Sequence, residues 1–319
     1  MGTGGSSGCL LVVFAALVVS SAAFLPSAVL PAVHTQLGAS SSVCSVSMNQ
    51  QRVAVVTGAN KGIGLEVSRI LGRQPGVLCV MGCRNAQLGQ QAAAVLQKEG
   101  CNVTFAQLDI NDKSSIANFA GMIKANYGGF DILVNNAAIA YKGRDPTPFA
   151  EQARPTLYTN FYGTLALCDA LVPLLRNGGR VSNVASMSGP LRQFPRKSHA
   201  RVLAPDFSRQ ELCELIDQFV ESAEKGDHGR AGWPNTCYGV SKAALNALTR
   251  IMARELAPRN ILVNSCCPGW CATDMSSHSG PRSAAQGADT PAFLAMLPAG
   301  SRSGEYWTDR QMQDWSRSY

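Results

Sequence analysis

Tyr238 and Lys242 are the residues of this chain whose types and spacing most directly suggest chemistry. Residues four apart on a helix share a face, so the phenol and the ammonium would point into the same cleft. A tyrosine ordinarily has a pKa of about 10, and a nearby cation would lower this pKa toward a range useful for proton transfer. The same spacing also arises by chance on solvated helix faces, so the pair needs support from the elements that position it.

A glycine-rich turn between a predicted strand and a predicted helix supplies the first support. Residues 53–57 form an apolar run typical of a buried parallel strand, and helical spacing begins at Leu65. Between them lie Gly58, Gly62 and Gly64. Such a turn lets a diphosphate approach the backbone, while the helix N-terminus supplies amides and a partial positive charge. In this context we predict a dinucleotide site, although an isolated glycine turn would often be only a turn.

The choice of cofactor follows from the end of the next predicted strand, residues 77–81. An acidic residue there accepts the ribose 2′-hydroxyl of NAD, whereas an arginine accommodates the 2′-phosphate of NADP. This chain has Arg84 there and Lys61 in the glycine turn, so we predict NADP(H). The alternative is that both are ordinary surface cations. Asp109 follows a strand at 103–108, where it could contact the cofactor, form an N-cap or turn, or do both.

Composition describes a globular protein with a sizeable core, because 46% of the 319 residues are hydrophobic and only 15% are charged. The net charge of +7 arises without a basic run or interleaved aromatic residues, so no nucleic acid partner is predicted and a small anionic ligand fits better. The 11 cysteines show no zinc-ligand spacing. We predict no metal site and interpret most thiols as small buried side chains in a reducing compartment.

The first 51 residues contain no Asp, Glu, Lys or Arg, whereas charged residues are regular from Arg52 onward. Residues 9–19 form an apolar run of signal-peptide length, too short for a membrane span, and residues 20–23 are small, as cleavage before Phe24 requires. The segment 22–26 resembles the cleavage junction of bipartite plastid presequences in algae with secondary plastids. We predict a targeting presequence, unstructured or cleaved, a plastid location and no stable membrane span in the mature form. Secretion, a signal anchor and a buried N-terminal helix are the alternatives.

Several motifs in order along the chain carry a resemblance to a known family. They occupy residues 57–64 (TGANKGIG), 135–137 (NNA), 159–163 (TNFYG), 238–242 (YGVSK) and 266–275 (CCPGWCATDM). Over about residues 52–315 the chain resembles the short-chain dehydrogenase/reductase family, and within it the carbonyl reductase subfamily. The resemblance implies an α/β fold at residues 52–319, a single doubly wound Rossmann-type domain with a parallel seven-stranded sheet and helices on both faces. It also implies reversible hydride transfer between a nicotinamide and a carbonyl or alcohol.

The resemblance also assigns roles by position. Tyr238 would donate the proton, Ser186 would hydrogen-bond the substrate carbonyl oxygen, and Asn160 would help to hold a proton-relay water. Lys242 would bind the nicotinamide ribose and lower the tyrosine pKa. Because ketone reduction develops negative charge on oxygen, a hydroxyl and a phenol aimed at that oxygen would stabilise it. Taken alone, Ser186 could be a strand-end turn serine and Asn160 a polar residue inside a helix.

The predicted binding residues form two sets. The cofactor set is Gly58, Asn60, Lys61, Gly62, Ile63, Gly64, Arg84, Asp109, Asn136, Tyr238, Lys242, Pro268, Gly269, Cys271 and Thr273. The substrate set is Ser186, Tyr238, Trp270 and Met275. Two positions depart from the family pattern: Ala138 stands where Gly is usual, and Ala185 replaces the first of two usual serines. The extra methyl group of Ala138 would crowd the adenosine side of the cofactor site, so we expect an altered affinity with function retained.

Residues 191–233 form a long insertion before the tyrosine-bearing segment. Ser208 and Glu211 fit a capping box, which predicts an added helix. That helix carries an apolar stripe, Leu212, Leu215, Ile216 and Phe219. The stripe would pack on its own domain, the simpler interpretation, or dock a partner. In carbonyl reductases a similar insertion covers the face that relatives use for tetramer formation, so the resemblance implies a monomer.

The leading functional hypothesis is an NADPH-dependent carbonyl reductase acting on small apolar or aromatic aldehydes, ketones or quinones. A cofactor-bound scaffold or redox sensor without turnover is a second hypothesis, which the complete set Asn160, Ser186, Tyr238 and Lys242 disfavours. A nucleotide-sugar epimerase or dehydratase is a third. Such enzymes share the tyrosine and lysine but normally carry a longer C-terminal substrate domain than this sequence has.

Overall fold

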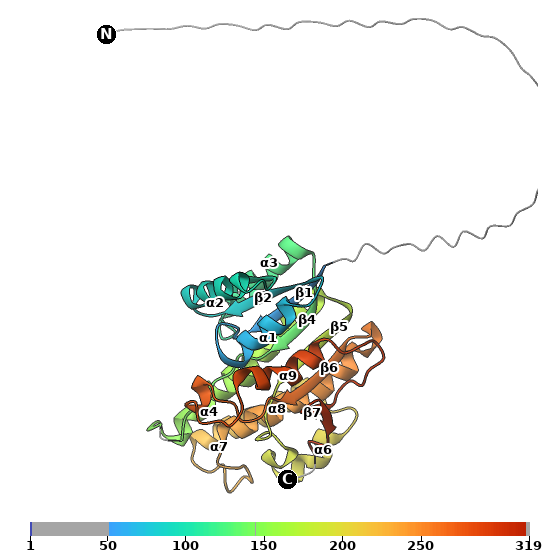
Figure 1. Cartoon of the computed structure of the whole chain (residues 1–319). Helices are drawn as coiled ribbons and strands as arrows, with labels where there is room; N and C mark the ends of the chain where they lie inside the picture. The colour runs from blue at the N-terminus through green and yellow to red at the C-terminus, as the bar shows by residue number, and fades with distance from the viewer. Residues whose placement is uncertain (2–50, 144, 317–319) are drawn as a thin grey trace, which may run out of the picture. The chain divides into compact units, whose positions relative to one another are not determined.

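The computed structural model describes Met1, residues 51–143 and residues 145–316 (Figure 1). The described residues from 51 onward belong to one compact unit. The predicted presequence, residues 1–51, lies outside the described residues apart from its two ends, so its targeting role stays a prediction.

One sheet organises the described part of the chain. Its strands are β1 Arg52–Thr57, β2 Val77–Cys83, β3 Val103–Gln107, β4 Phe130–Asn135, β5 Leu175–Val184, β6 Leu262–Cys267, β7 Tyr306–Thr308 and β8 Gln311–Gln313. Their order across the sheet is β3-β2-β1-β4-β5-β6-β7-β8. The strand order reverses between β1 and β4, and doubly wound sheets bind ligands at the carboxyl ends of the strands at such a point. The predicted fold class is confirmed.

The strand count differs from the predicted seven, because β8 pairs with β7 in the antiparallel sense. The two strands are joined by Asp309 and Arg310, both in the left-handed region at φ 50° and 59°. Glycine or asparagine usually signals such a turn, and neither is present. The strand itself has only three residues, Gln311, Met312 and Gln313, and is largely exposed at the sheet edge, so it lacks the apolar run by which buried strands are predicted.

Helices cover both faces of the sheet. They are α1 Gly62–Gly72, α2 Ala86–Lys98, α3 Lys113–Tyr127, α4 Phe149–Leu157, α5 Thr164–Leu171, α6 His199–Leu203, α7 Arg209–Glu224, α8 Cys237–Leu256 and α9 Ala284–Ala295, with a π-helical turn η1, Tyr158–Gly163, between α4 and α5. One face packs against α1, α2 and α9, and the other against α3, α5 and α8. In residues 51–143 and 145–316, no helix combines the length and the apolar character needed to cross a membrane.

The insertion packs on its own domain through α7. Leu212, Ile216 and Phe219 are fully buried against α4 and α8, whereas Leu215 is half-buried. Phe219 also meets Trp233 at the end of the insertion, with ring centroids 5.1 Å apart. The packing interpretation of the apolar stripe is therefore confirmed, since burial leaves most of the stripe no surface with which to dock a partner.

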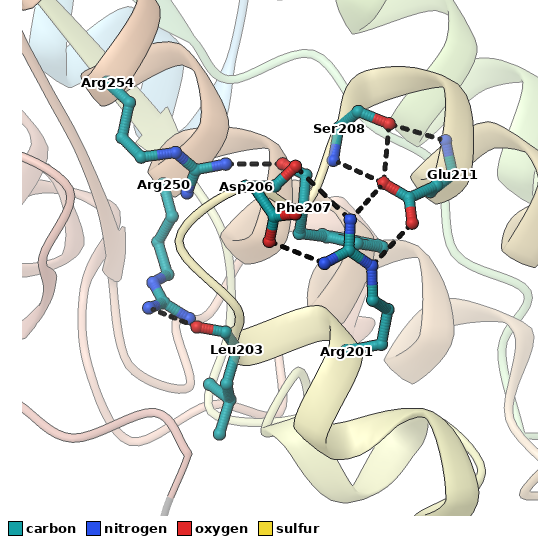
Figure 2. Close-up of polar contacts among 8 residues, drawn as sticks. All are labelled: Arg201, Leu203, Asp206, Phe207, Ser208, Glu211, Arg250 and Arg254. Carbon is teal, nitrogen blue, oxygen red and sulfur yellow. Dashed lines mark hydrogen bonds and ion pairs between the residues drawn. The ribbon is translucent and has the colours of Figure 1, made fainter.

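Polar contacts fix the start of α7 (Figure 2). The predicted capping box is present: the Ser208 hydroxyl accepts from the Glu211 amide at 3.2 Å, and the Glu211 carboxylate accepts from the Ser208 amide at 3.0 Å. Arg201 of α6 forms ion pairs with Glu211 and Asp206, and its contact with Glu211 helps to hold the pKa of that carboxyl at about 2. These contacts hold the end of α6 against the start of α7.

Replacing Ser208 with alanine is expected to destabilise the fold by about 1 kcal/mol, because an orphan amide of the first turn of α7 loses its acceptor. Urea unfolding measures this change. Ser114→Ala is the matched control, because this exposed serine lies in the first turn of α3 while Asp112 supplies the cap. Equal stability of the two variants would show that the capping box contributes nothing.

Candidate active site

Two adjoining cavities lie at the carboxyl edge of the sheet. The first, of about 440 Å³, is bounded by the residues that follow β1, β2, β3 and β4. The second, of about 320 Å³, lies among the residues that follow β5 and β6 and the start of α8. Ile63, Asn136 and Thr273 line both, so the cavities meet. Together they offer room for an extended ligand.

The glycine turn forms one wall of the first cavity. Gly58 and Gly62 take positive φ values of 63° and 58°, a conformation that favours glycine. A Cβ on Gly64 would lie 2.4 Å from the Gly58 carbonyl oxygen, so this position packs behind the turn and does not line either cavity. The Asn136 side-chain amide donates to the Thr57 carbonyl at 2.9 Å and braces the turn against β4.

The two predicted phosphate-binding cations lie on this cavity in different states. Arg84 lines it directly after β2 and is exposed. Lys61 instead forms an ion pair with Asp274, Nζ to carboxylate 2.6 Å, which joins the glycine turn to the loop after β6. Asp109 also lines the cavity, and its carboxylate accepts from the Asn111 amide at 2.9 Å. Two compatible roles were predicted for Asp109, a turn residue and a residue that faces the ligand site. The structure shows the turn contact and places Asp109 on the cavity.

Tyr238 and Lys242 project from the beginning of α8. The Thr236 hydroxyl accepts from the Gly239 amide at 3.0 Å, so this N-cap fixes the helix start beside the tyrosine. The Lys242 Nζ lies 5.6 Å from the centroid of the Tyr238 ring, as the shared helix face predicts. The ammonium also donates to the Val184 carbonyl at the end of β5, at 2.8 Å. Both side chains line the second cavity.

Burial controls the protonation of this pair. It raises the pKa of Tyr238 to about 12, and a hydrogen bond with the Ser186 side chain lowers that pKa only in part. Burial also lowers the pKa of Lys242 to about 8. The expectation of a tyrosine pKa below its ordinary value is therefore wrong for this arrangement, because desolvation of the buried phenolate has the largest effect on this pKa. At neutral pH the phenol is protonated, the state that a proton donor requires.

Asn160 lines neither cavity. It occupies η1 and is buried, and its amide nitrogen donates to the Ile139 carbonyl at 2.9 Å and to the Ser241 hydroxyl at 3.0 Å. Its oxygen accepts from the Ile139 amide at 2.8 Å. Asn160 thus ties the segment after β4 to α8, and its role toward a relay water stays a prediction.

An apolar rim surrounds the mouth of the second cavity. Trp270 and Met275, both predicted substrate residues, are 58% and 40% exposed. Met187, directly after Ser186, is 63% exposed and was not predicted. These three large apolar side chains are exposed and line a concave site. They therefore provide a surface for an apolar ligand.

The remaining predicted residues fall on the cavities as follows. Asn60 lines the first cavity, and Pro268, Gly269 and Cys271 line the second. Sequence reasoning missed further lining residues, among them Thr57, Asn85, Leu88, Leu108, Ile110, Asn111, Thr159, Met187, Ser188 and Cys267. Most follow strand ends, and that position is the signal that could have found them. Ala138 lines both cavities, so its methyl group lies where they meet as well as on the predicted adenosine side.

Two family models match the chain. One is described as short chain dehydrogenase and covers residues 52–199, and the other is described as enoyl-(acyl carrier protein) reductase and covers residues 226–294. The carbonyl reductase (NADPH) 1 of Homo sapiens is 41% identical over 271 residues, which span 82% of this chain and 98% of that protein. The carbonyl reductase (NADPH) 3 of Rattus norvegicus is 42% identical over 272 residues, 83% of this chain and 98% of that protein.

Solved structures agree with these matches. Salutaridine reductase from Papaver somniferum superposes with a TM-score of 0.74 at 29% identity, covering 80% of this chain and 99% of that one. Menthone neomenthol reductase from Mentha piperita gives a TM-score of 0.68 at 30% identity, with 80% and 98% coverage. The fold and the paired cavities define a Rossmann-type oxidoreductase. The chain belongs to the short-chain dehydrogenase/reductase family, and carbonyl reductases are among its relatives.

Proposed function

We propose that this protein is an NADPH-dependent carbonyl reductase that reduces aldehydes, ketones or quinones, with Tyr238 as the proton donor. One observation carries the proposal: Tyr238 and Ser186 line one cavity that adjoins the dinucleotide cleft, and the Ser186 side chain is near enough to the phenol to lower the Tyr238 pKa. A carbonyl oxygen placed between these hydroxyls meets two donors. The apolar rim of Met187, Trp270 and Met275 favours apolar or aromatic substrates.

The cofactor is NADP(H), and the residues present fit it. Positive φ at Gly58 and Gly62 allows a diphosphate to approach the backbone, and the N-terminus of α1 offers its free amides. Arg84 would hold the 2′-phosphate, and Lys61 would join it by exchanging its Asp274 partner. The two carbonyl reductases named above are NADPH enzymes by name. When bound, the cofactor supplies the hydride.

The chain's own residues then transfer one proton and stabilise the negative charge that develops on the carbonyl oxygen. Tyr238 gives its phenolic proton to the carbonyl oxygen, and Ser186 donates a hydrogen bond to the same oxygen. Lys242 lies under the phenol and stabilises the phenolate that the transfer leaves behind. The hydride on carbon and the proton on oxygen together make the alcohol. Asn160 holds the beginning of α8 against the segment after β4.

The high pKa of Tyr238 sets the expected pH dependence. Reduction needs the protonated phenol, which persists below a pKa of about 12, and the charged Lys242, whose pKa is about 8, so kcat/KM for reduction should be level near neutral pH and fall above about pH 8. Oxidation of the product alcohol needs the phenolate, so kcat/KM in that direction should rise from neutral pH upward. Steady-state rates in both directions across this range test the prediction. A maximum for alcohol oxidation at neutral pH would contradict it.

A panel of aldehydes, ketones and quinones tested for NADPH oxidation examines the proposed function. Apolar aromatic carbonyls are expected to react fastest, because of the apolar rim. Tight binding of NADPH without turnover of any carbonyl would favour the alternative of a cofactor-bound scaffold or redox sensor.

For the cellular context we propose, from the sequence, that residues 1–51 direct the protein to a plastid, and that α7 keeps the mature enzyme monomeric. Sequencing the N-terminus of the native protein tests whether the presequence is cleaved, and retention of Met1 would refute cleavage. Sedimentation equilibrium tests the second, with a tetramer as the refuting result.

A further inference from the structure

Ser186 belongs to a short loop, residues 186–189, that lies directly on α8. The Ser186 hydroxyl accepts from the Ser188 amide at 3.1 Å, and the Ser186 carbonyl accepts from the Gly189 amide at 3.0 Å. A Cβ on Gly189 would lie 2.6 Å from the backbone carbon of Lys242, so the loop meets the helix without a gap. The position of the Ser186 hydroxyl therefore depends on the peptide groups that follow it.

Two buried side-chain amides hold those peptide groups. Gln193, 9% exposed, donates from Nε2 to the Ser188 carbonyl at 2.7 Å. Asn246, 2% exposed, donates from Nδ2 to the Gly189 carbonyl at 2.8 Å. Both carbonyls are thereby satisfied by side chains from outside the loop, one from the first turn of the insertion and one from α8.

Gln193 also touches the tyrosine-bearing turn. A Cβ on Gly239, the residue after Tyr238, would lie 2.7 Å from the Gln193 amide nitrogen and 2.9 Å from its Cδ. The amide group therefore sits between the serine loop and α8 and contacts both. One side chain of the insertion therefore contacts both the loop that carries Ser186 and the turn of α8 that carries Tyr238, the two proposed hydroxyl donors.

We propose that Gln193 is a positioning residue for carbonyl reduction: together with Asn246 it sets the Ser186 hydroxyl against the Tyr238 phenol. The inference rests on the proposed function and adds a role for the insertion, whose first turn then serves the geometry of catalysis as well as the covering of α8. Small displacements of groups that contact the reacting atoms have large effects on rate, so loss of either amide donor should lower kcat.

Isosteric substitutions separate the hydrogen bond from the packing. Gln193→Glu and Gln193→Met keep the size of the side chain and remove the N–H donor, and Asn246→Asp does the same at the second carbonyl. The matched control is Gln97→Glu, because Gln97 donates to the Val103 carbonyl at 2.8 Å beside β3, away from both cavities. Thermal unfolding identifies the variants that remain folded, and Gln193→Met avoids a buried carboxylate.

We expect kcat for the fastest carbonyl to fall by about 10- to 100-fold in the Gln193 variants, with the Kd for NADPH unchanged. At a fixed alkaline pH, kcat for alcohol oxidation should fall further than kcat for reduction, because a displaced Ser186 side chain no longer lowers the Tyr238 pKa and less phenolate is present. A folded Gln193→Met protein with the wild-type kcat and pH profile would overturn the inference, even if its melting temperature were lower, because that result describes a structural role alone.

A crystal structure of Gln193→Met gives a readout that does not depend on activity. The inference predicts a displaced Ser186 hydroxyl that no longer meets the Tyr238 phenol, and an unchanged contact refutes it. Wild-type protein without reductase activity would count against the proposed function, and this structure would still decide the positioning role.

Discussion

Replacing Tyr238 with phenylalanine is expected to lower kcat for carbonyl reduction by about 10²- to 10⁴-fold, the usual contribution of a positioned acid. The substitution removes the only group proposed to give a proton to the carbonyl oxygen. It keeps the ring that lies 5.6 Å from the Lys242 Nζ, so the fold and the cation should be retained. Pre-steady-state measurement of NADPH oxidation gives the rate, and fluorescence titration gives the NADPH affinity, which should remain near the wild-type value.

Tyr162→Phe is the matched control for this change. Its phenol is also partly buried and donates to Asp217 at 2.5 Å, and burial likewise raises its pKa, but it lines neither cavity. The control should lose some stability and keep its activity. If Tyr238→Phe were as active as Tyr162→Phe, another group would have to supply the proton.

Replacing Arg84 with alanine is expected to raise the Kd for NADPH by about 10- to 100-fold, because a hydrogen bond between charged groups contributes roughly 1.5–3 kcal/mol. The Kd for NADH should change little, since NADH lacks the 2′-phosphate. Titration of both cofactors by fluorescence measures the two affinities. We expect Lys61→Ala to cost less than Arg84→Ala, because Lys61 must first give up its ion pair with Asp274.

Arg73→Ala provides the control, because Arg73 is exposed at the end of α1 and forms an ion pair with Glu99 outside both cavities. It removes the same charge without touching the cofactor site. Equal losses of NADPH and NADH affinity in Arg84→Ala would show that the 2′-phosphate site lies elsewhere.

Local sequence signals predicted the elements that position the site. The glycine turn after β1, the capping box at Ser208 and the helix that carries Tyr238 each depend on residues within a few positions of one another. The buried strands were predictable because parallel strands covered on both faces are continuously apolar. Parallel strand ends meet at one edge of the sheet, so residues following different strands could be expected in one site before the structure was known.

What could not be predicted depends on contacts distant in sequence or on burial. Lys61 meets Asp274 213 residues away, and no local pattern announces that pair. The pKa of Tyr238 depends on how deeply the phenol is buried, which the spacing to Lys242 does not reveal. The amide of Gln193 reaches the serine loop because the insertion folds back on α8, a consequence of tertiary packing.

Transfer of deuterium from NADPH that carries deuterium at both hydrogen positions of nicotinamide C4 tests the central claim most directly. The enzyme is incubated with labelled NADPH and the carbonyl that reacts fastest in the panel, and the product is analysed by mass spectrometry. The account predicts an alcohol with one deuterium on the former carbonyl carbon, and far less product with Tyr238→Phe. Failure of every carbonyl to oxidise the labelled NADPH, or an alcohol without deuterium, would contradict it.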